Sequence, residues 1–291
     1  MTLEASAALP RRRSPARRLA ARLGSRETAA GLAILAVLGL VAALAPVISP
    51  HSPEAIDANR VLKGLSWSHP FGSDALGRDV LSRVLFAFRS SLLISLGAVA
   101  LALVGGIPIG VVCGYFGGWV DAILMRPVDM LLALPALLLA LSLITVFGPG
   151  RLVAMFAIAV IYVPILARVI RSSVLAVRTE AYVEGARARG ASHLSTIARH
   201  VVPNAIGPAL VQASVLCGFA LQIEAALSFL GLGVQPPTPS LGLMLFDGYQ
   251  VLQQAPWADV FPGLAIALTV VAFNLVGDGL RARLDPLGIA R

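Results

Sequence analysis

Charged residues are scarce in this chain. They make up 13% of its 291 residues, whereas about a quarter is usual in a soluble globular domain. Hydrophobic residues make up 57%. A chain this apolar lacks the charged surface that would keep it dissolved in water. The composition therefore argues against a water-soluble domain and indicates that lipid surrounds most of the chain.

Cysteine is also scarce, and several motifs of catalysis and binding are missing. The two cysteines, Cys113 and Cys217, lie inside apolar runs, where cysteine usually serves as a small buried hydrophobe. They indicate neither a disulfide framework nor a metal site. The sequence has no phosphate-binding loop of the Walker A type, and its four histidines show no metal-ligand spacing. We therefore expect no catalytic residue, no metal site and no cofactor bound by this chain.

Long apolar runs are what the chain has in abundance. A helix that crosses a membrane needs about 20 mostly apolar residues. Six runs are candidates: Ala29–Ile48, Ser90–Phe116, Ala122–Val146, Leu152–Ala167, Ile206–Gly231 and Val260–Gly279. The first follows an arginine-rich stretch, but it is longer than the apolar region of a cleaved signal peptide, so we interpret it as a retained helix. The predicted fold class is an all-α integral membrane protein with about six transmembrane helices.

The distribution of arginine predicts the orientation of these helices. Cytoplasmic loops of membrane proteins carry an excess of Lys and Arg, and this excess arises here when both termini are cytoplasmic. The predicted parts are then a basic cytoplasmic tail (1–28), a transmembrane domain (29–286) and a C-terminal tail (287–291). Within the domain we expect an external segment (49–89) and a long cytoplasmic loop (171–204). The basic tail is expected to attract anionic membrane lipids and not nucleic acid.

The long cytoplasmic loop has the pattern of two short helices around a turn. Gly190 lies where a left-handed residue would end the first helix, and Ser192 can cap the start of the second. The second helix has an apolar stripe of three residues: Leu194, Ile197 and Val201. On this pattern alone, an amphipathic connector lying flat on the membrane is an equally open interpretation.

Charged residues interrupt the apolar runs at a few positions, of which Glu224, Arg126 and Asp129 are the candidates for a role. Glu224 lies inside the fifth run, where a carboxylate is costly and marks either a transport pathway or the pairing of two helices. Both interpretations stay open for Glu224. Arg126 and Asp129 lie three residues apart in the third run, so they could pair on one face of a helix near its cytoplasmic end.

Five residues of the cytoplasmic loop have a characteristic spacing: Glu184, Gly185, Ala186, Gly190 and Pro203. With this spacing the loop resembles the EAA loop of bacterial ABC-importer permeases. The usual pattern has alanine at the position of Gly185. Four further segments are similar to permeases of dipeptide, oligopeptide and nickel importers, in particular the second, C-type permease of the dipeptide system. They are HPFGSDALGRDVLSR (69–83), GYFGGWVD (114–121), LSFLGLGVQPP (227–237) and NLVGDGLR (274–281).

This resemblance implies a type I ABC-importer permease fold in the bacterial cytoplasmic (inner) membrane. The chain would form half of a translocation pathway for di- or oligopeptides. Its partners would be a homologous second permease, two cytoplasmic ATPase subunits and an extracytoplasmic solute-binding protein. ATP and Mg²⁺ would bind to the ATPases, and the helix of the EAA loop would be the coupling helix that docks on one of them. Nickel chelates or glutathione are alternative substrates.

An ATP-independent secondary transporter is an alternative of a different class. Such a protein should contain inverted repeats or several ionisable groups near the middle of the membrane. The sequence has no convincing repeat, and Glu224 is nearly alone as a charged residue within the apolar runs. The residues therefore favour a permease that is driven by separate ATPase subunits.

Overall fold

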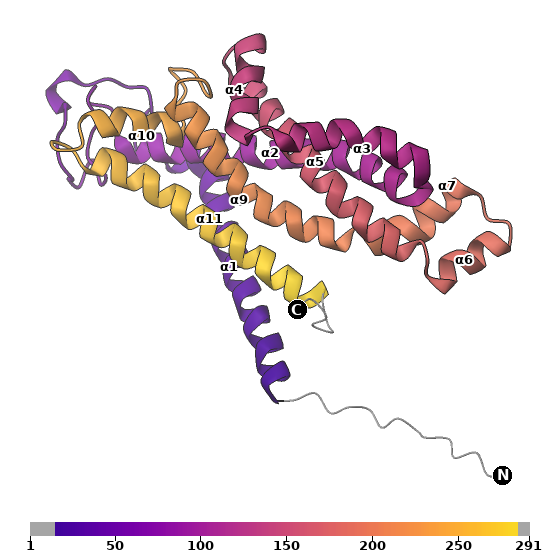
Figure 1. The fold of residues 1–291 in the computed structure, drawn as a ribbon. Helices are drawn as coiled ribbons and strands as arrows, with labels where there is room; N and C mark the ends of the chain where they lie inside the picture. The colour runs from indigo at the N-terminus through magenta and orange to yellow at the C-terminus, as the bar shows by residue number, and fades with distance from the viewer. Residues whose placement is uncertain (1–14, 285–291) are drawn as a thin grey trace, which may run out of the picture.

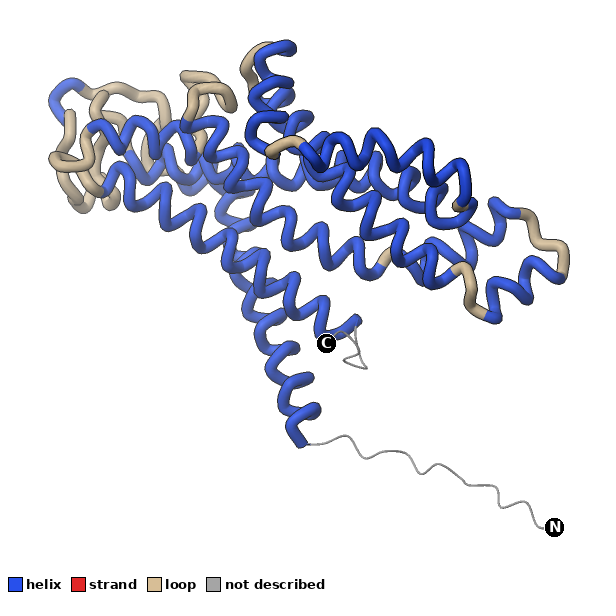
Figure 2. The backbone as a smooth tube through the Cα atoms, viewed as in Figure 1, coloured by secondary structure: helices blue, strands red, loops and turns tan. Residues whose placement is uncertain are grey.

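The computed structural model describes residues 15–284, and within this range the chain forms helices and loops without a β-strand (Figure 2). Five helices are long and apolar enough to cross a membrane. They are α1 (Pro15–Ile48), α2 (Val80–Phe116), α5 (Arg151–Val177), α9 (Gly207–Phe229) and α11 (Trp257–Leu284). The predicted all-α membrane class is confirmed. Residues 15–28 of the predicted basic tail (1–28) belong to α1, whereas residues 1–14 and the predicted C-terminal tail (287–291) lie outside the described residues.

The third apolar run forms two helices where a single one was predicted. Helix α3 (Gly118–Ala133) and helix α4 (Ala136–Phe147) meet at an angle of 98°. The break has a local cause, because the residue before a proline is driven out of the helical region. Leu134, which precedes Pro135, has the extended angles φ −88° and ψ 137°. The pair forms either one broken span or a re-entrant loop, which gives five or six apolar spans.

Helices α1, α2, α5 and α11 all extend beyond their predicted limits. Helix α2 begins at Val80, ten residues before the predicted start. Asp79 caps it, since the Asp79 carboxylate accepts a hydrogen bond of 2.8 Å from the Ser82 amide. Arg83 made this turn resemble a loop in the sequence, although the side chain is buried. Helix α5 likewise continues to Val177, well past the end of its apolar run.

Close helix packing places α2 against α5. Gly110 and Gly114 of α2 face α5, and a Cβ at Gly110 would lie 2.5 Å from the Ala167 carbonyl oxygen. A Cβ at Gly114 would lie 2.7 Å from the Cβ of Val174. Small residues at such contacts allow two membrane helices to approach closely. Helix α1 packs along α11, and α11 also contacts α9.

The short elements gather at opposite ends of the bundle (Figure 1). One end holds the loops of residues 49–79, which include η1 (Ala58–Arg60), together with α10 (Leu241–Gln250). Helix α10 lies in the connection between the last two spans. The other end holds α6 (Ala181–Ala188) and α7 (His193–Thr196). From α7 the chain passes through η2 (Ile197–Val201) and α8 (Val202–Ala205) into α9.

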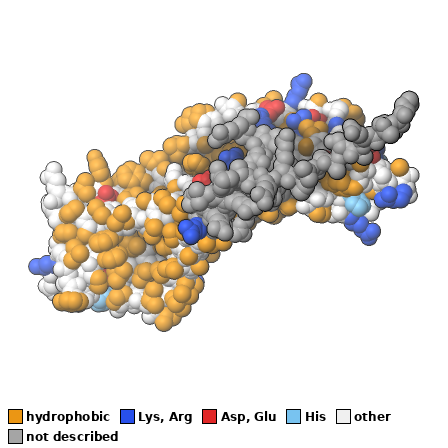
Figure 3. All heavy atoms as spheres, turned by 90° about the horizontal axis from the view of Figure 1, so that it is seen from below, with side chains coloured by type: hydrophobic (Ala, Val, Ile, Leu, Met, Phe, Trp, Pro, Cys, Tyr) orange, Lys and Arg blue, Asp and Glu red, His pale blue; other side chains and the backbone are white. Residues whose placement is uncertain are grey.

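Side chains of different kinds cover different parts of the bundle. In Figure 3, hydrophobic side chains dominate the visible face, and basic side chains gather at the end that carries α6 and α7. Large hydrophobic residues along the spans are exposed, including Val104, Leu152 and Val271. A surface of this kind suits a bilayer, where apolar side chains contact lipid tails.

Candidate functional site

The turn between α6 and α7 is built around Gly190. This glycine has φ +82°, the left-handed conformation that the sequence predicted, which glycine adopts without a steric clash. The Gly190 amide donates to the Arg187 carbonyl at 2.9 Å, and the Ala191 amide donates to the Ala186 carbonyl at 3.2 Å. These two bonds form a Schellman motif. The chain therefore ends α6 sharply and turns toward α7.

The second half of the loop agrees with its prediction only in part. The Ser192 hydroxyl accepts a hydrogen bond of 3.3 Å from the Ser195 amide, so Ser192 caps α7 as expected. The predicted apolar stripe is incomplete, because Val201 is buried whereas Leu194 is 77% exposed. Helix α7 is only four residues long and the chain continues as a π-helical turn, which changes the faces that a regular helix would give. Leu194 therefore offers apolar surface at this end of the bundle.

One face of α6 is packed against the membrane helices. Val183 is fully buried and Ala186 is 2% exposed, whereas Glu184 and Arg187 lie on the exposed face. Val183 belongs to a hydrophobic cluster that joins α6 to α2, α5 and the segment before α9. The other buried members are Val111, Tyr115, Ile170, Val174, Val201, Ala205 and Ala209. The packing fixes α6 to the bundle and leaves its charged face accessible.

Polar contacts also join the loop to the end of α2. The Arg178 guanidinium donates to the carbonyl oxygens of Gly114 at 3.0 Å and Tyr115 at 3.1 Å. The Tyr115 hydroxyl lies 3.0 Å from Nδ1 of His193 in a hydrogen bond. A cavity of about 450 Å³ lies between these elements, lined by Tyr115, Phe116, Arg178, Thr179, Glu184, Arg187 and His193. The loop is therefore held to α2 and α5 by both apolar and polar contacts.

The five predicted loop residues lie at the end of the bundle that carries α6 and α7. Glu184, Gly185 and Ala186 lie within α6, Gly190 forms its terminal turn, and Pro203 lies further along in α8. The Glu184 carboxylate has no hydrogen bond or ion pair with any residue that the structure describes. Glu184 is thus not anchored to the backbone of its own loop within the described residues. Its carboxylate remains free to contact another chain.

Glu224 is fully buried in α9. The Ser228 hydroxyl donates to Oε1 of Glu224 at 2.8 Å, and Ser91 of α2 faces the same carboxyl group. Ser228 belongs to α9 itself, so Ser91 is the contact that joins Glu224 to a neighbouring helix, and Oε2 of Glu224 has no hydrogen-bond partner among the described residues. The contact with Ser91 is consistent with helix pairing, one of the two interpretations, both of which stay open.

Asp129 has a different partner from the expected one. Its Oδ1 lies 2.5 Å from Nη2 of Arg168 in α5, whereas Arg126 is exposed and forms no ion pair within residues 15–284. A second ion pair, Asp121 with Arg171, joins the same two helices and was not predicted. The predicted pairing of Arg126 with Asp129 is wrong because α5 places an arginine beside α3.

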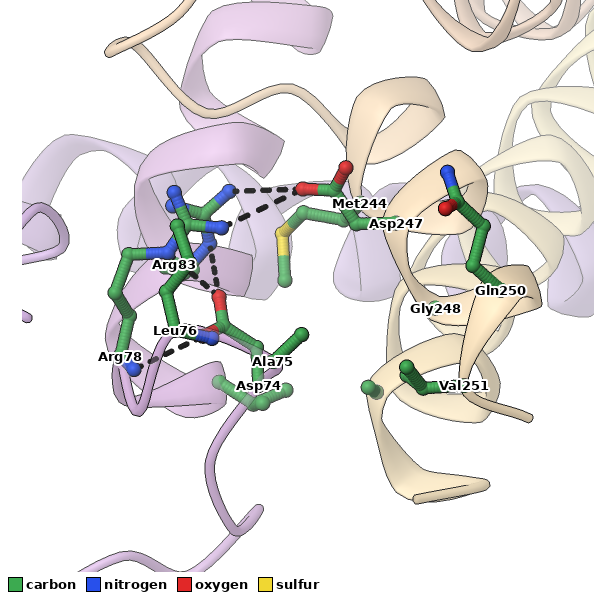
Figure 4. A pocket seen from close by; sticks show the side chains of 12 residues that line it. Asp74, Ala75, Leu76, Arg78, Arg83, Met244, Asp247, Gly248, Gln250 and Val251 are labelled. Atoms are coloured by element: carbon green, nitrogen blue, oxygen red, sulfur yellow. Dashed lines mark hydrogen bonds and ion pairs between the residues drawn. The ribbon is translucent and has the colours of Figure 1, made fainter. Parts of the chain in front are cut away.

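A pocket at the opposite end of the bundle was not predicted (Figure 4). It has a volume of about 260 Å³ and lies between the loop that precedes α2 and helix α10. Its charged residues are Asp74, Arg78, Arg83 and Asp247. Burial raises the pKa of the Asp247 carboxyl above its usual value, while the two guanidinium groups oppose this rise. Asp247 is far from the other three in sequence, so spacing gave no signal for this pocket.

Two histidines meet the cap of α2, although their sequence spacing gave no sign of it. His51, His69 and Asp79 place their ligand atoms within 4.8 Å of one another. Nδ1 of His69 is 2.8 Å from one carboxylate oxygen of Asp79, and Ser82 donates to the other. Both oxygens of Asp79 are thus occupied in capping α2 and holding His69, which accounts for the cluster as part of the fold.

Comparison with known proteins identifies the family to which this chain is similar. Residues 106–287 match the family described as "Binding-protein-dependent transport system inner membrane component". The dipeptide transport system permease protein DppC of Alkalihalophilus pseudofirmus is 41% identical, covering 88% of this chain and 84% of that protein. The glutathione transport system permease protein GsiD of Pectobacterium atrosepticum is 39% identical, covering 89% and 86%. The probable D,D-dipeptide transport system permease protein DdpC of Escherichia coli is 40% identical, covering 90% and 88%.

Solved structures of ABC importers share the fold. The MetNI methionine ABC transporter in an inward-facing conformation contains a chain with TM-score 0.55 and 18% identity, covering 70% of this chain and 95% of that one. An amino acid ABC transporter gives TM-score 0.53 at 16% identity, covering 66% and 90%. The likeness shows the type I ABC-importer permease fold. The chain therefore belongs to the family of binding-protein-dependent transport system inner membrane components and is a permease subunit of an ABC importer.

Proposed function

We propose that this permease carries short peptides, with dipeptides as its main substrates. The relatives described above are named for the transport of dipeptides, D,D-dipeptides and glutathione. Glutathione is itself a small peptide, so all three substrates share the peptide bond and charged ends. Glutathione and nickel chelates remain the alternative substrates.

The loop of α6 and α7 is proposed to be the docking site for a cytoplasmic ATPase subunit. The single observation that carries this proposal is the burial of Val183 in the cluster that joins α6 to the membrane helices. Because α6 is fixed in this way, a force on its exposed face moves the bundle as a rigid body. Glu184, Arg187 and Leu194 supply the charged and apolar surface for the contact.

The remaining components follow from this role. A homologous permease would complete the pathway, two ATPase subunits would bind ATP and Mg²⁺, and an extracytoplasmic binding protein would deliver the peptide. This chain itself would be non-catalytic and bind no cofactor. In the bacterial inner membrane, both termini and the α6–α7 end would face the cytoplasm, in accord with the basic residues at that end.

Reconstitution of the complete transporter in proteoliposomes tests the proposal. We expect ATP-dependent uptake of a labelled dipeptide that requires the binding protein and is reduced by unlabelled di- and tripeptides. Glutathione and a nickel chelate are to be tested in the same vesicles. Uptake of either of these without uptake of dipeptides would contradict the proposed substrate. A cysteine introduced at Gly190 should react with a membrane-impermeant reagent only from the cytoplasmic side.

A further inference from the structure

The pocket beside α10 contains two carboxylates and two guanidinium groups, and the Asp247 carboxylate has only long contacts with its partners. The Asp74 carboxylate lies 2.7 Å from Nε of Arg78. Asp247 lies 3.4 Å from Nη2 of Arg78 and 3.8 Å from Nη2 of Arg83. Close charge-assisted hydrogen bonds are about 2.7–2.9 Å long. Asp74 therefore has a firm partner, whereas Asp247 is only loosely paired.

The two arginines are less exposed than Asp247. The Arg83 side chain is 2% exposed and Arg78 is 15% exposed, whereas Asp247 is 36% exposed. The guanidinium of Arg83 also lies 3.4 Å from the nearest carboxylate oxygen of Asp74. A buried guanidinium has five donors to satisfy, and these contacts are long. The arginines are thus fixed in place with spare hydrogen-bonding capacity, and Asp247 is the partner that can move.

We propose that this pocket receives the two charged ends of a short zwitterionic peptide. The peptide carboxylate takes the place of Asp247 on Arg78 and Arg83, and the released Asp247 binds the peptide ammonium group. This inference rests on the proposed function in peptide import, and it assigns a receiving site at the end of the bundle opposite α6 and α7 (Figure 1).

The exchange of partners keeps every charge paired. Arg83 is buried, and a buried charge that loses a partner is unfavourable. A ligand with only a carboxylate would leave Asp247 without a partner, and a ligand with only an ammonium group would leave the two guanidinium groups with Asp74 alone. A peptide with both ends free supplies one partner to each. The pocket should therefore discriminate against peptides that are blocked at either end.

Size and lining also suit a short peptide. Sites for drug-sized ligands measure about 300–1,000 Å³, and this pocket of about 260 Å³ is slightly smaller. Its apolar lining offers contacts for small peptide side chains, through Leu76, Val80, Met244 and Val251. Longer peptides would have to extend out of the pocket, which favours dipeptides.

Binding to the complete transporter in nanodiscs, without the binding protein, tests the site. The ligands are alanyl-alanine, its N-acetyl form and its C-terminal amide. In the wild type we expect each blocked form to bind about ten-fold more weakly or worse, the effect of one charged hydrogen bond. In Asp247→Asn, the preference for the free over the acetylated amino end should fall to within about two-fold, while the preference for a free carboxylate remains.

Asp57→Asn is the matched control, because Asp57 is a partly exposed acid of the same loops that pairs with Arg60 and does not line the pocket. It should keep both preferences. An unchanged preference for the free amino end in Asp247→Asn would overturn the proposal, as would its equal loss in Asp57→Asn. Uptake of dipeptides by the same purified wild-type transporter in proteoliposomes keeps this result separate from the proposed function, since uptake without binding at this pocket refutes only the receiving site.

Thiol labelling gives a second, independent measurement. Leu76 lines the pocket and is 46% exposed, and the two natural cysteines of the chain are buried. Leu76→Cys therefore introduces an accessible thiol, whose labelling on this subunit can be followed by mass spectrometry. Alanyl-alanine should slow the labelling at least about three-fold, at a saturating concentration near 100 times its Kd. Equal slowing by the doubly blocked peptide, or no slowing at all, would contradict the site.

Discussion

Tyr115 at the end of α2 and His193 at the start of α7 are joined by a hydrogen bond of 3.0 Å between the Tyr115 hydroxyl and Nδ1 of His193. The contact connects a membrane-spanning helix directly to the loop that we propose as the ATPase docking site. It also lies against the cavity bordered by Glu184 and Arg187. If the loop docks an ATPase as proposed, its movement would reach α2 through this polar contact as well as through packing.

Tyr115→Phe should weaken coupling without preventing assembly. The change removes a hydrogen bond worth about 0.5–1.5 kcal/mol and keeps the aromatic ring in its cluster. We expect normal amounts of assembled complex, together with a lower ratio of peptide imported to ATP hydrolysed. Tyr249→Phe, at an exposed tyrosine of α10, is the control and should keep the ratio of the wild type. An unaltered ratio in Tyr115→Phe would show that packing alone transmits the movement.

Gly190→Val should misdirect α7. At φ +82° a β-branched residue strains the backbone by about 1–3 kcal/mol. We expect the subunit to insert in the membrane but to retain less ATPase subunit during purification, measured as subunit stoichiometry. Gly185→Ala is the control, because a Cβ there would meet only the Arg189 guanidinium at an ordinary 3.5 Å. Full retention of the ATPase in Gly190→Val would refute the proposed role of the turn.

Glu184→Lys should disturb docking and not folding. The carboxylate is exposed and unpaired within the described chain. Reversal of its charge should therefore change the free energy of unfolding of the subunit by no more than about 0.5 kcal/mol. We expect weaker association with the ATPase and less stimulation of ATP hydrolysis by loaded binding protein. Glu54→Lys reverses an exposed charge at the other end of the bundle and serves as control. Equal effects of the two substitutions would point to overall charge and not to docking.

Glu224 is expected to act through helix pairing. Replacement by alanine removes the carboxylate that accepts the hydrogen bond of Ser228. We expect this to lower the free energy of unfolding by about 1–3 kcal/mol. Glu224→Gln retains an acceptor oxygen and should behave much like the wild type. We therefore expect Glu224→Ala to lower assembled complex and peptide uptake in parallel, so that uptake per assembled complex stays constant. If Glu224→Gln assembled fully but lost transport, the carboxylate would belong to the pathway.

The membrane helices and the turn at Gly190 could be predicted because their signals are local. Length and apolarity determine a span, and a glycine at the end of a helix determines a left-handed turn. The break at Leu134 was also a local signal, since Pro135 follows it, but proline is common enough within membrane helices that it did not decide between a kink and a break.

Partners that are distant in sequence could not be predicted. Asp129 could pair either with Arg126 of its own helix α3 or with an arginine of a neighbouring helix. The packing of α3 against α5 selects Arg168. Asp247 meets Arg78 and Arg83 because α10 folds back over the start of α2. Neither contact follows from residue spacing, because each depends on which helices lie side by side.

Helix α2 runs without interruption from Val80 to Phe116, a length of about 55 Å at 1.5 Å per residue. Its first turns carry Arg83 of the external pocket, and its last turn carries Tyr115 beside the loop of α6 and α7. The proposed peptide pocket and the proposed ATPase docking loop therefore both contact the same continuous helix, α2. If both proposals hold, a peptide that releases Asp247 would act on one end of α2 and the ATPase on the other, so that a single helix would connect peptide binding to ATP hydrolysis.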